Sequence, residues 1–525
     1  MVGAARHTRN IDARAAQERP LDAEGTGPVT SSMESASGPA QDADPPEEAP
    51  DPLRWWSLLA VSLATFMTYL DLNVINVAIP TIQRSLHLSE AGLEWIVSSY
   101  LLTLAGLLLA GGRLADAYGR RRLYMIGLLV FTLSSLSAGL AGNGGVLIAS
   151  RAVQGIGAAL LTPATLAIIT ATFTDLKERT NAIGLWTVSA AAGLALGPVT
   201  GGLITQNIHW GWIFLINVPI GVATLALSVR TVRESRAPAN NRVLDVGGLV
   251  TSAVALFAVT YALIEGNDAG WTSMKIVAAF VVAGVAGVAF FVIESRTAEP
   301  MVDLGLFRIR QFTGGISTQM IWAFGALAIY FFTSIYLQDI LGFSPSKAGL
   351  LFVPMAFALA AFAGFSTLME AWIGGFRTVS LGMVMMTVGL IMLNMHDEHA
   401  TFASLLPSLI VLGGGMGIMN VPMTNAVMQN TPEAQAGVAS AILNDAREVA
   451  GLLGITIIGA VLRSKQNAEL RSGSTPGQAF LDGYHVGMWV ATALVAVGIV
   501  FTYVMLRPSR EPSLDKEPVA AQQLT

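Results

Sequence analysis

Two ionisable side chains within apolar stretches have the types and the depth that proton binding inside a membrane requires. Asp71 lies in the apolar stretch 55–80, about nine residues, or roughly 13 Å, from its outer end. Arg151 lies about six or seven residues, or roughly 10 Å, into the stretch 145–173, so we expect the two at a shared depth. Gln154 follows three residues later on the same helical face. Because charges at the membrane centre are costly, such residues indicate a functional site.

An acid, a base and an amide that converge on one cavity can bind and release a proton. The alternative interpretation is a permanent ion pair between Asp71 and Arg151 that only fixes the packing of two helices. We take proton coupling by Asp71, Arg151 and Gln154 as the prediction to be examined.

A second group of charges lies in the stretch 435–462, which contains Asn444, Asp445, Arg447 and Glu448. Asp445 and Glu448 are three residues apart and share a helical face, whereas Arg447 points elsewhere. The two acids fit a second protonation or cation-binding site. They fit equally well an intrahelical charge network that closes an inner gate, and the sequence leaves both open.

Other polar and aromatic side chains in the apolar stretches are candidates of a weaker kind. Those that could contact a substrate are Asn73, Asn76, Trp186, Trp322 and Phe324. Four further acids fall near the ends of stretches, where we expect them at the membrane interface: Glu90, Glu94, Asp339 and Glu370.

Small residues recur every four positions in the stretch 181–205, at Ser189, Gly193, Gly197 and Gly201, and Gly202 follows. A face of small residues lets a neighbouring helix approach closely. Pro198 removes one backbone hydrogen bond from the same helix. Close packing beside a kink predicts a hinge between two states of a cavity.

The segment 112–122 begins with Gly112 and ends in three arginines. Gly119 allows a sharp turn at the end of a helix. We expect Asp116 to accept hydrogen bonds from the first turn of the next helix. The arginines should anchor the inner face of the membrane.

Composition places all of these residues in a helical membrane protein. The chain has 525 residues, of which 53% are hydrophobic and 12% charged, against roughly 25% charged in a soluble domain. It has no Cys, which excludes disulfides and thiolate metal sites. A net charge of −5 argues against nucleic acid as a partner.

Fourteen apolar stretches are long enough to cross a hydrocarbon layer of about 30 Å. They are 55–80, 92–115, 121–141, 145–173, 181–205, 210–229, 244–264, 275–293, 311–338, 347–371, 377–395, 401–429, 435–462 and 484–506. We expect a disordered cytoplasmic tail at 1–53, a six-helix bundle at 54–230, a linker with two extra spans at 231–310, a second six-helix bundle at 311–507 and a cytoplasmic tail at 508–525.

The basic residues predict which way the chain is inserted. With both termini inside, most Lys and Arg fall on the inner side, for example in 120–122 and 230–242, and few fall outside. Half of the outer ones belong to one long predicted outer loop at 463–483. We therefore expect a multi-pass protein of the plasma (inner) membrane with both termini in the cytoplasm.

Four segments resemble motifs of the major facilitator superfamily, in particular of its fourteen-helix drug:proton antiporters. They are, in chain order, 70–80, 112–122, 151–157 and 193–202. A fifth segment, 209–219, is similar to the family's approach to its sixth span, but Gly211 replaces the customary Arg. The resemblance covers about 54–507 and implies an all-α polytopic membrane protein with the major facilitator fold, two six-helix bundles plus two extra transmembrane helices, 14 in total.

The resemblance also implies roles for particular residues. It assigns proton coupling to Asp71, Arg151 and Gln154, with Asp445 and Glu448 as acids where the family usually has uncharged residues. It assigns gating to a latch of Asp116 with Arg120, which is expected to hold the inner gate in the outward-open state, and to a hinge in the glycine-rich helix at Gly197 and Pro198. The full gating set is Gly112, Asp116, Gly119, Arg120, Gly193, Gly197, Pro198, Gly201, Gly202 and Arg447.

The expected function is proton-coupled efflux of amphipathic, often cationic, drugs or antibiotics by alternating access. The alternatives are export of a dedicated endogenous metabolite, lipid or siderophore, and proton-coupled uptake of a nutrient. We expect the substrate, protons and membrane lipid as partners, with no nucleic acid, no ATPase subunit, no metal and no cofactor. An enzyme is not expected, because the sequence has no phosphate-binding loop and no cluster of metal ligands.

Overall fold

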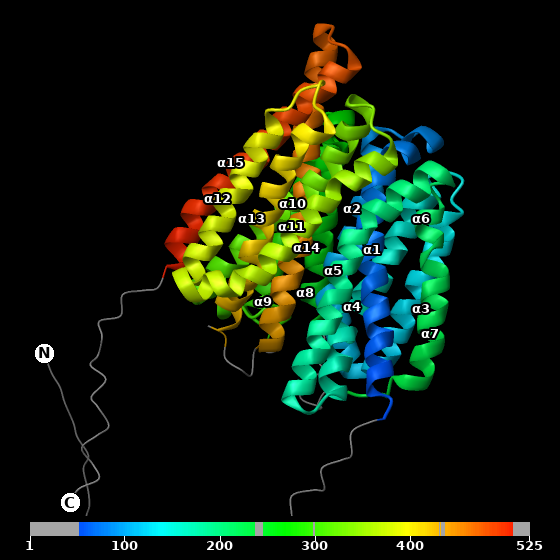
Figure 1. Ribbon diagram of the computed structural model, residues 1–525, viewed down its shortest axis with the longest axis vertical. Helices are drawn as coiled ribbons and strands as arrows, with labels where there is room; N and C mark the ends of the chain where they lie inside the picture. Colours follow the sequence, from blue (N-terminus) through cyan, green and yellow to red (C-terminus); the bar gives the residue numbers. More distant parts are fainter. Residues whose placement is uncertain (1–51, 237–244, 298–299, 430, 432–435, 508–525) are drawn as a thin grey trace, which may run out of the picture. The chain divides into compact units, whose positions relative to one another are not determined.

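The computed structural model describes residues 52–236, 245–297, 300–429, 431 and 436–507, and these residues form helices and no strand (Figure 1). The predicted tails therefore lie outside the described residues, apart from residues 52 and 53. The helices are α1 Arg54–Leu86, α2 Glu90–Tyr118, α3 Arg120–Gly139, α4 Gly144–Thr172, α5 Leu176–Asn207, α6 Trp212–Leu215, α7 Asn217–Thr231, α8 Val246–Ala269, α9 Met274–Glu294, the 3₁₀ turn η2 Leu306–Arg308, α10 Arg310–Ile335, its π-helical continuation η3 Tyr336–Ile340, α11 Pro345–Ile373, α12 Gly375–Asn394, α13 Phe402–Met428, α14 Ala436–Ser472 and α15 Pro476–Leu506.

Within the described residues, 13 helical segments are long and apolar enough to cross a membrane, counting α6 with α7 and α10 with η3 as single segments. α14 has 37 residues and carries the charged cluster around Asp445. Adding α14 to the 13 gives the fourteen spans that the sequence predicts. The all-α class is confirmed, and the ends of most spans lie within a few residues of the predicted ones.

The predicted long outer loop at 463–483 is wrong, because α14 runs through its first half and α15 through its second. Lys465 donates to Glu469 over 2.5 Å, an ion pair one helical turn apart that supports the end of α14. Thr475 then caps α15 by accepting the backbone N–H of Gln478. A search for apolar stretches alone assigns the charged end of a long helix to a loop.

Side-chain caps start many of the helices. Ser89 begins α2, Asn143 begins α4, Ser344 begins α11, and each accepts a backbone N–H of the first turn. Thr401 and Ser404 form a reciprocal capping box at the start of α13. Each cap stabilises its helix by about 1 kcal/mol.

The helices before α8 pack among themselves, as do those after α9. α1 packs against α5 and α7, and α4 against α2 and α3, whereas α13 packs against α11 and α12, and α10 against α14 and α15. Figure 1 shows α1, α3 and α7 on one side and α12 and α15 on the other. The two groups meet where α5 packs against α11 and α2 against α14, and α8 contacts both α2 and α14.

We call the end of the bundle at which α1 begins and α15 ends the terminal end, and the opposite end the far end (Figure 1). Odd-numbered α1 and α3 run from the terminal end to the far end, and α2 and α4 run back. The N-terminal and C-terminal groups of helices are called the first and second halves below.

Candidate functional site

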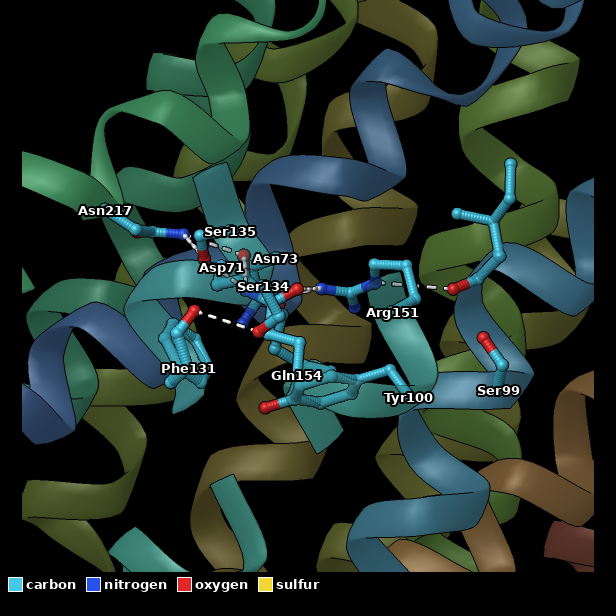
Figure 2. Close-up of polar contacts among 12 residues, drawn as sticks. Asp71, Asn73, Ser99, Tyr100, Phe131, Ser134, Ser135, Arg151, Gln154 and Asn217 are labelled. Atoms are coloured by element: carbon cyan, nitrogen blue, oxygen red, sulfur yellow. Dashed lines mark hydrogen bonds and ion pairs between the residues drawn. The ribbon is translucent and has the colours of Figure 1, made fainter. Parts of the chain in front are cut away.

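Asp71 of α1 and Arg151 of α4 form an ion pair in the interior of the first half. Arg151 Nη1 lies 2.6 Å from Asp71 Oδ2, and both side chains are 0% exposed. The structure thus brings together the acid and the base that the sequence places at one depth. Figure 2 shows the pair with the amide and hydroxyl groups around it.

Three further side chains complete the surroundings of the Asp71 carboxylate. Gln154 Nε2 and Asn217 Nδ2 each donate to Asp71 Oδ1 over 2.8 Å. Gln154 Nε2 also donates to Ser135 Oγ over 2.7 Å, and its Oε1 accepts from Arg151 Nη1 over 2.6 Å (Figure 2). Every group that contacts the carboxylate is a donor, which is the set that an ionised Asp accepts.

Arg151 has contacts of a second kind. Its guanidinium carbon lies 4.2 Å from the centre of the Tyr100 ring and 5.6 Å from that of Phe214. Its Nε donates to the Ile96 carbonyl oxygen over 3.3 Å, whereas its buried Nη2 has no hydrogen-bond partner among the described residues. Because the Tyr100 ring holds the guanidinium and Nη2 makes no hydrogen bond to the described residues, Arg151 can exchange Asp71 for another hydrogen-bond acceptor while it stays on the ring.

Glycines allow the helices around the Asp71–Arg151 pair to pack closely against one another. A Cβ added at Gly155 of α4 would overlap the backbone of α2 at Tyr100. A Cβ added at Gly193 of α5 would lie 2.6 Å from the carbonyl oxygen of Phe66 in α1, and one at Gly197 would lie 2.6 Å from Asn73 Cβ. The predicted small-residue face of α5 therefore packs on α1, directly beside Asp71.

A cavity of about 370 Å³ lies between the two halves. Its wall combines apolar residues with a few charged and aromatic ones. The wall residues are Thr68, Tyr69, Leu72, Tyr100, Leu104, Leu108, Leu109, Gly112, Asp116, Arg120, Thr162, Pro163, Leu166, Ala167, Thr170, Trp186, Ser440, Ala441, Asn444, Arg447 and Glu448. Asp71 itself is not part of this wall, but the Tyr100 ring on which Arg151 lies is part of it.

The charged residues that the second half contributes to this wall are Arg447 and Glu448 of α14. Arg447 donates to Glu448 Oε1 over 2.8 Å and to the hydroxyl of Tyr69 in α1 over 3.3 Å. The expectation that Arg447 points away from the acids is wrong, because its long side chain folds back onto its neighbour. Asp445 is absent from the wall, and its buried Oδ1 has no hydrogen-bond partner in the described part of the chain.

The cavity extends to the terminal end, where the predicted latch residues lie. Asp116 and Arg120 form an ion pair over 2.9 Å, and Arg120 also donates to the Ala167 carbonyl oxygen in α4. Asp116 does not cap α3 as the sequence predicted. Instead Glu234, beyond α7, accepts the backbone N–H of Arg121 over 3.0 Å.

At the far end the two halves are in contact. Gly202 of α5 lies against the backbone of α11 at Pro345, and Gly349 of α11 lies against Pro198 of α5. Gln338 of η3 donates to the Val77 carbonyl oxygen of α1 over 2.8 Å. These contacts close the cavity of about 370 Å³ on its far-end side, and that cavity extends toward the terminal end.

The far end also holds an ion pair that the sequence analysis missed. Glu94 of α2 is 2% exposed and pairs with Arg463 of α14 over 3.1 Å. Nearby, Arg84 Nη1 lies 3.2 Å from Asp339 Oδ1. The sequence places Glu94 near the end of a span but does not predict that it is buried between α2 and α14. The i, i+4 spacing of Glu90 and Glu94 was the available signal, because it places both acids on one face.

Of the five predicted substrate contacts, Trp186 lies on the wall of the cavity, and its Nε1 donates to Thr65 Oγ1 over 2.7 Å. Asn73 donates to the Tyr69 carbonyl oxygen instead, and Asn76 to that of Leu72. Trp322 and Phe324 pack in the core of the second half and are likewise absent from the wall. Their aromatic side chains fill space between helices.

Other residues of the site escaped the sequence analysis or differ from it. Asn217, Ser135 and Tyr100 complete the Asp71 network, and the position of Asn217 within the fifth matching segment was the one signal for it. Gly211 of that segment packs against the backbone of Gly139, so this close approach leaves no space for the Arg that the family customarily has.

Comparisons with known proteins agree with this architecture. The Major Facilitator Superfamily profile matches residues 61–455. The multidrug resistance protein Stp of Mycobacterium tuberculosis is 37% identical over 416 residues, covering 79% of this chain and 77% of Stp. The puromycin resistance protein pur8 of Streptomyces alboniger is 33% identical, covering 87% and 92%. The multidrug efflux pump LfrA of Mycolicibacterium smegmatis is 34% identical, covering 85% and 89%.

Among solved structures, a bacterial homologue of the human lysosomal transporter Spinster, in an inward-facing and unoccupied conformation, superposes with a TM-score of 0.61 at 16% identity. The alignment covers 87% of this chain and 98% of that one, and it shows a shared fold. Together with the profile match and the relatives, it identifies this multi-pass membrane protein as a member of the Major Facilitator Superfamily of transporters.

Proposed function

We propose that the chain is a proton-coupled antiporter that exports amphipathic, cationic compounds by alternating access. The observation that carries the proposal is the buried Asp71–Arg151 pair, which touches the wall of the central cavity through Tyr100. A buried charged pair within a membrane span is costly, so its presence indicates a function. The names of Stp, pur8 and LfrA describe resistance and efflux, which supports export of drugs or antibiotics.

In this proposal Asp71 is the residue that exchanges its proton during transport. A proton on Asp71 removes the negative charge that Arg151 pairs with, and the free Nη2 of Arg151 gives the guanidinium another direction in which to bond. Because Arg151 lies on the Tyr100 ring, its movement changes the cavity wall. Binding of the substrate in the cavity and binding of the proton to Asp71 therefore affect each other through Tyr100, although the substrate does not contact Asp71.

The cavity wall fits an amphipathic cation. Its apolar residues from α2 and α4 can cover a flat hydrophobic body, and the rings of Tyr69, Tyr100 and Trp186 can lie against a positive charge. Among the described residues of the second half, Glu448 is the acid on this wall. In the present state its carboxylate forms an ion pair with Arg447. A cationic substrate would displace Arg447 from Glu448, which links binding to the contact between Arg447 and Tyr69 of the first half.

The proposal places the terminal end in the cytoplasm and the protein in the plasma (inner) membrane. The arginines around Gly119 and the ends of α7 and α15 support this orientation through the positive-inside rule. The present state then faces inward, with its cavity toward the cytoplasm. Each unit of pH difference supplies about 1.4 kcal/mol per proton, so the gradient alone drives export without a cofactor or an ATPase subunit.

Export of one dedicated compound is the second candidate. The tetracenomycin C resistance and export protein of Streptomyces glaucescens is 31% identical over 411 residues, covering 78% of this chain and 76% of that one, and its name describes a single compound. A panel of lipophilic cations and neutral antibiotics distinguishes the two. A multidrug exporter transports several members of the panel, whereas a dedicated exporter transports one or none.

Transport in everted membrane vesicles tests the proposal. With an imposed gradient, acidic inside, vesicles that contain the chain should accumulate a fluorescent lipophilic cation such as ethidium. Accumulation with the opposite gradient would indicate a symporter. Asp71→Asn should abolish gradient-driven accumulation, whereas Glu370→Gln, a carboxylate of α11 away from the cavity wall, should retain it. Full transport by Asp71→Asn would overturn the assignment of Asp71.

A further inference from the structure

A second buried ion pair joins the two halves at the far end. Glu94 of α2 and Arg463 of α14 lie 3.1 Å apart, and their side chains are 3% and 4% exposed. The carboxylate of Glu94 lies directly against the backbone of α14 at Gly459, where a Cβ would overlap it. The absence of a side chain at Gly459 therefore leaves the space that the carboxylate occupies.

Among the described residues, acidic groups outnumber basic ones around this pair. The charged groups that face Glu94 are Glu90 on its own helix, Glu265 and Asp268 on α8, and Arg463 on α14. Glu90 accepts from Gln466 over 2.8 Å and Glu265 from Trp95 over 2.8 Å, whereas Arg463 makes its ion pair with Glu94. Negative charge in excess of its counterions is unfavourable in such surroundings, and a proton is the smallest ligand that removes it.

A cavity of about 270 Å³ leads to the pair from the far end. Its wall includes Glu90, Glu94 and Arg463 together with the exposed residues Asp339 and Pro476. Two buried polar atoms beside it, Arg463 Nη1 and Gln466 Oε1, have no hydrogen-bond partner among the described residues. The cavity gives water of the far end a route to the Glu94 carboxylate while the central cavity remains closed on that side.

The extra helix α8 holds both partners of the pair in place. Glu265 of α8 accepts from Trp95, the residue next to Glu94, and Asn267 donates to the Ala460 carbonyl oxygen of α14 over 2.8 Å. Arg463 also donates to the Leu263 carbonyl oxygen of α8 over 3.5 Å. One of the two additional spans thus connects the first half to the second at the level of the ion pair.

We propose that Glu94 is a second proton-binding site, distinct from Asp71, and that its protonation opens the far end. A proton taken from far-end water forms an O–H bond on Glu94 and removes the charge that holds Arg463. Arg463 would then lose the carboxylate that it contacts, which is strongly unfavourable for a buried cation, so α14 separates from α2 and exposes Arg463 to water. The proton returns to the same water when the pair forms again. This inference rests on the proposed antiport, in which the far end faces the acidic side.

Distance measurements between spin labels test the inference, and the chain has no native Cys to interfere. Leu140→Cys with Met395→Cys reports on the far end, and Tyr118→Cys with Trp372→Cys on the terminal end, because all four residues are exposed. In lipid nanodiscs, lowering the pH from 8 to 5 should lengthen the far-end distance. Glu94→Gln should give the long distance already at pH 8, with at least about a tenfold rise in the ratio of open to closed molecules.

Two controls keep the result interpretable. Glu94→Asp retains an acid and should retain a pH-dependent transition, which distinguishes loss of the proton site from misfolding. Glu370→Gln should behave as the wild type. A far-end distance that stays short and pH-sensitive in Glu94→Gln would overturn the inference. If wild-type vesicles show no gradient-driven transport but the pH-dependent opening is present, the proposed antiport is wrong, whereas the inference that protonation of Glu94 opens the far end is retained.

Discussion

The guanidinium of Arg151 lies 4.2 Å from the centre of the Tyr100 ring, and Tyr100 is part of the wall of the central cavity. This contact connects a buried ion pair, which no substrate can touch directly, to the space in which a substrate would bind. A change in the pairing of Arg151 therefore reaches the cavity through one aromatic ring.

Replacing the ring tests this connection. Tyr100→Leu removes the cation–π contact, which contributes about 0.5–2 kcal/mol, so binding of a lipophilic cation should become less sensitive to pH. Tyr100→Phe retains the ring and should behave as the wild type. The measurement is the dissociation constant of ethidium at pH 6 and pH 8, by fluorescence in detergent. An unchanged ratio of the two constants in Tyr100→Leu would contradict the role of the ring.

Removing one partner of the buried pair should cost more than removing both. Arg151→Met leaves the Asp71 carboxylate unpaired and should destabilise the protein by about 3–5 kcal/mol. The double variant Asp71→Asn with Arg151→Met should recover part of that loss, since the two residues are in direct contact. Arg120→Met, at the partly exposed pair with Asp116, should cost about 1 kcal/mol or less. Thermal unfolding in detergent compares these variants with Asp71→Asn alone, and a loss in the double variant equal to the sum of the two single losses would argue against the coupling.

Glu448 should determine the preference for cationic substrates. Glu448→Gln keeps the size of the side chain but removes its charge, so affinity for a lipophilic cation should fall by about tenfold or more, while a neutral drug is unaffected. Asp445→Asn, on the same helix but away from the wall, is the matched variant and should leave cation affinity close to that of the wild type. Equal losses for cationic and neutral drugs in Glu448→Gln would point to a purely structural role.

The close packing of α5 on α1 can be tested within one helix. Gly193→Ala would place a Cβ 2.6 Å from the Phe66 carbonyl oxygen and should destabilise the protein by about 1–3 kcal/mol. A Cβ at Gly184 would meet no atom of the described residues within 4 Å, so Gly184→Ala should be neutral or stabilise the helix by about 0.5–1 kcal/mol. Melting temperatures of the two variants that agree within error would show that α5 does not depend on this contact.

Much of the fold follows from the sequence because membrane spans are recognised by length and apolar content alone. The meeting of Asp71, Arg151 and Gln154 was also predictable, since helical rise converts position along a span into depth. Depth does not reveal the rotation of a helix, so Asn217, Ser135 and Tyr100 around the pair were not identified.

The far-end pair illustrates a second limit. Glu94 and Arg463 are 369 residues apart, and each lies near the end of a predicted span, where charged residues are ordinarily exposed. Their burial depends on α8 and α14 packing over them, which no local pattern encodes. The same limit applies to Trp322 and Phe324, because an aromatic side chain looks alike in sequence whether it faces a cavity or a neighbouring helix.

Proton release on substrate binding tests the central claim most directly. Purified protein in weakly buffered detergent at pH 7 is titrated with ethidium while a pH indicator records the protons that enter solution. If substrate binding displaces a proton from Asp71, the wild type and Glu370→Gln should release protons as their sites fill, and Asp71→Asn should bind ethidium with a clearly smaller release. Equal release from Asp71→Asn and the wild type would contradict the account.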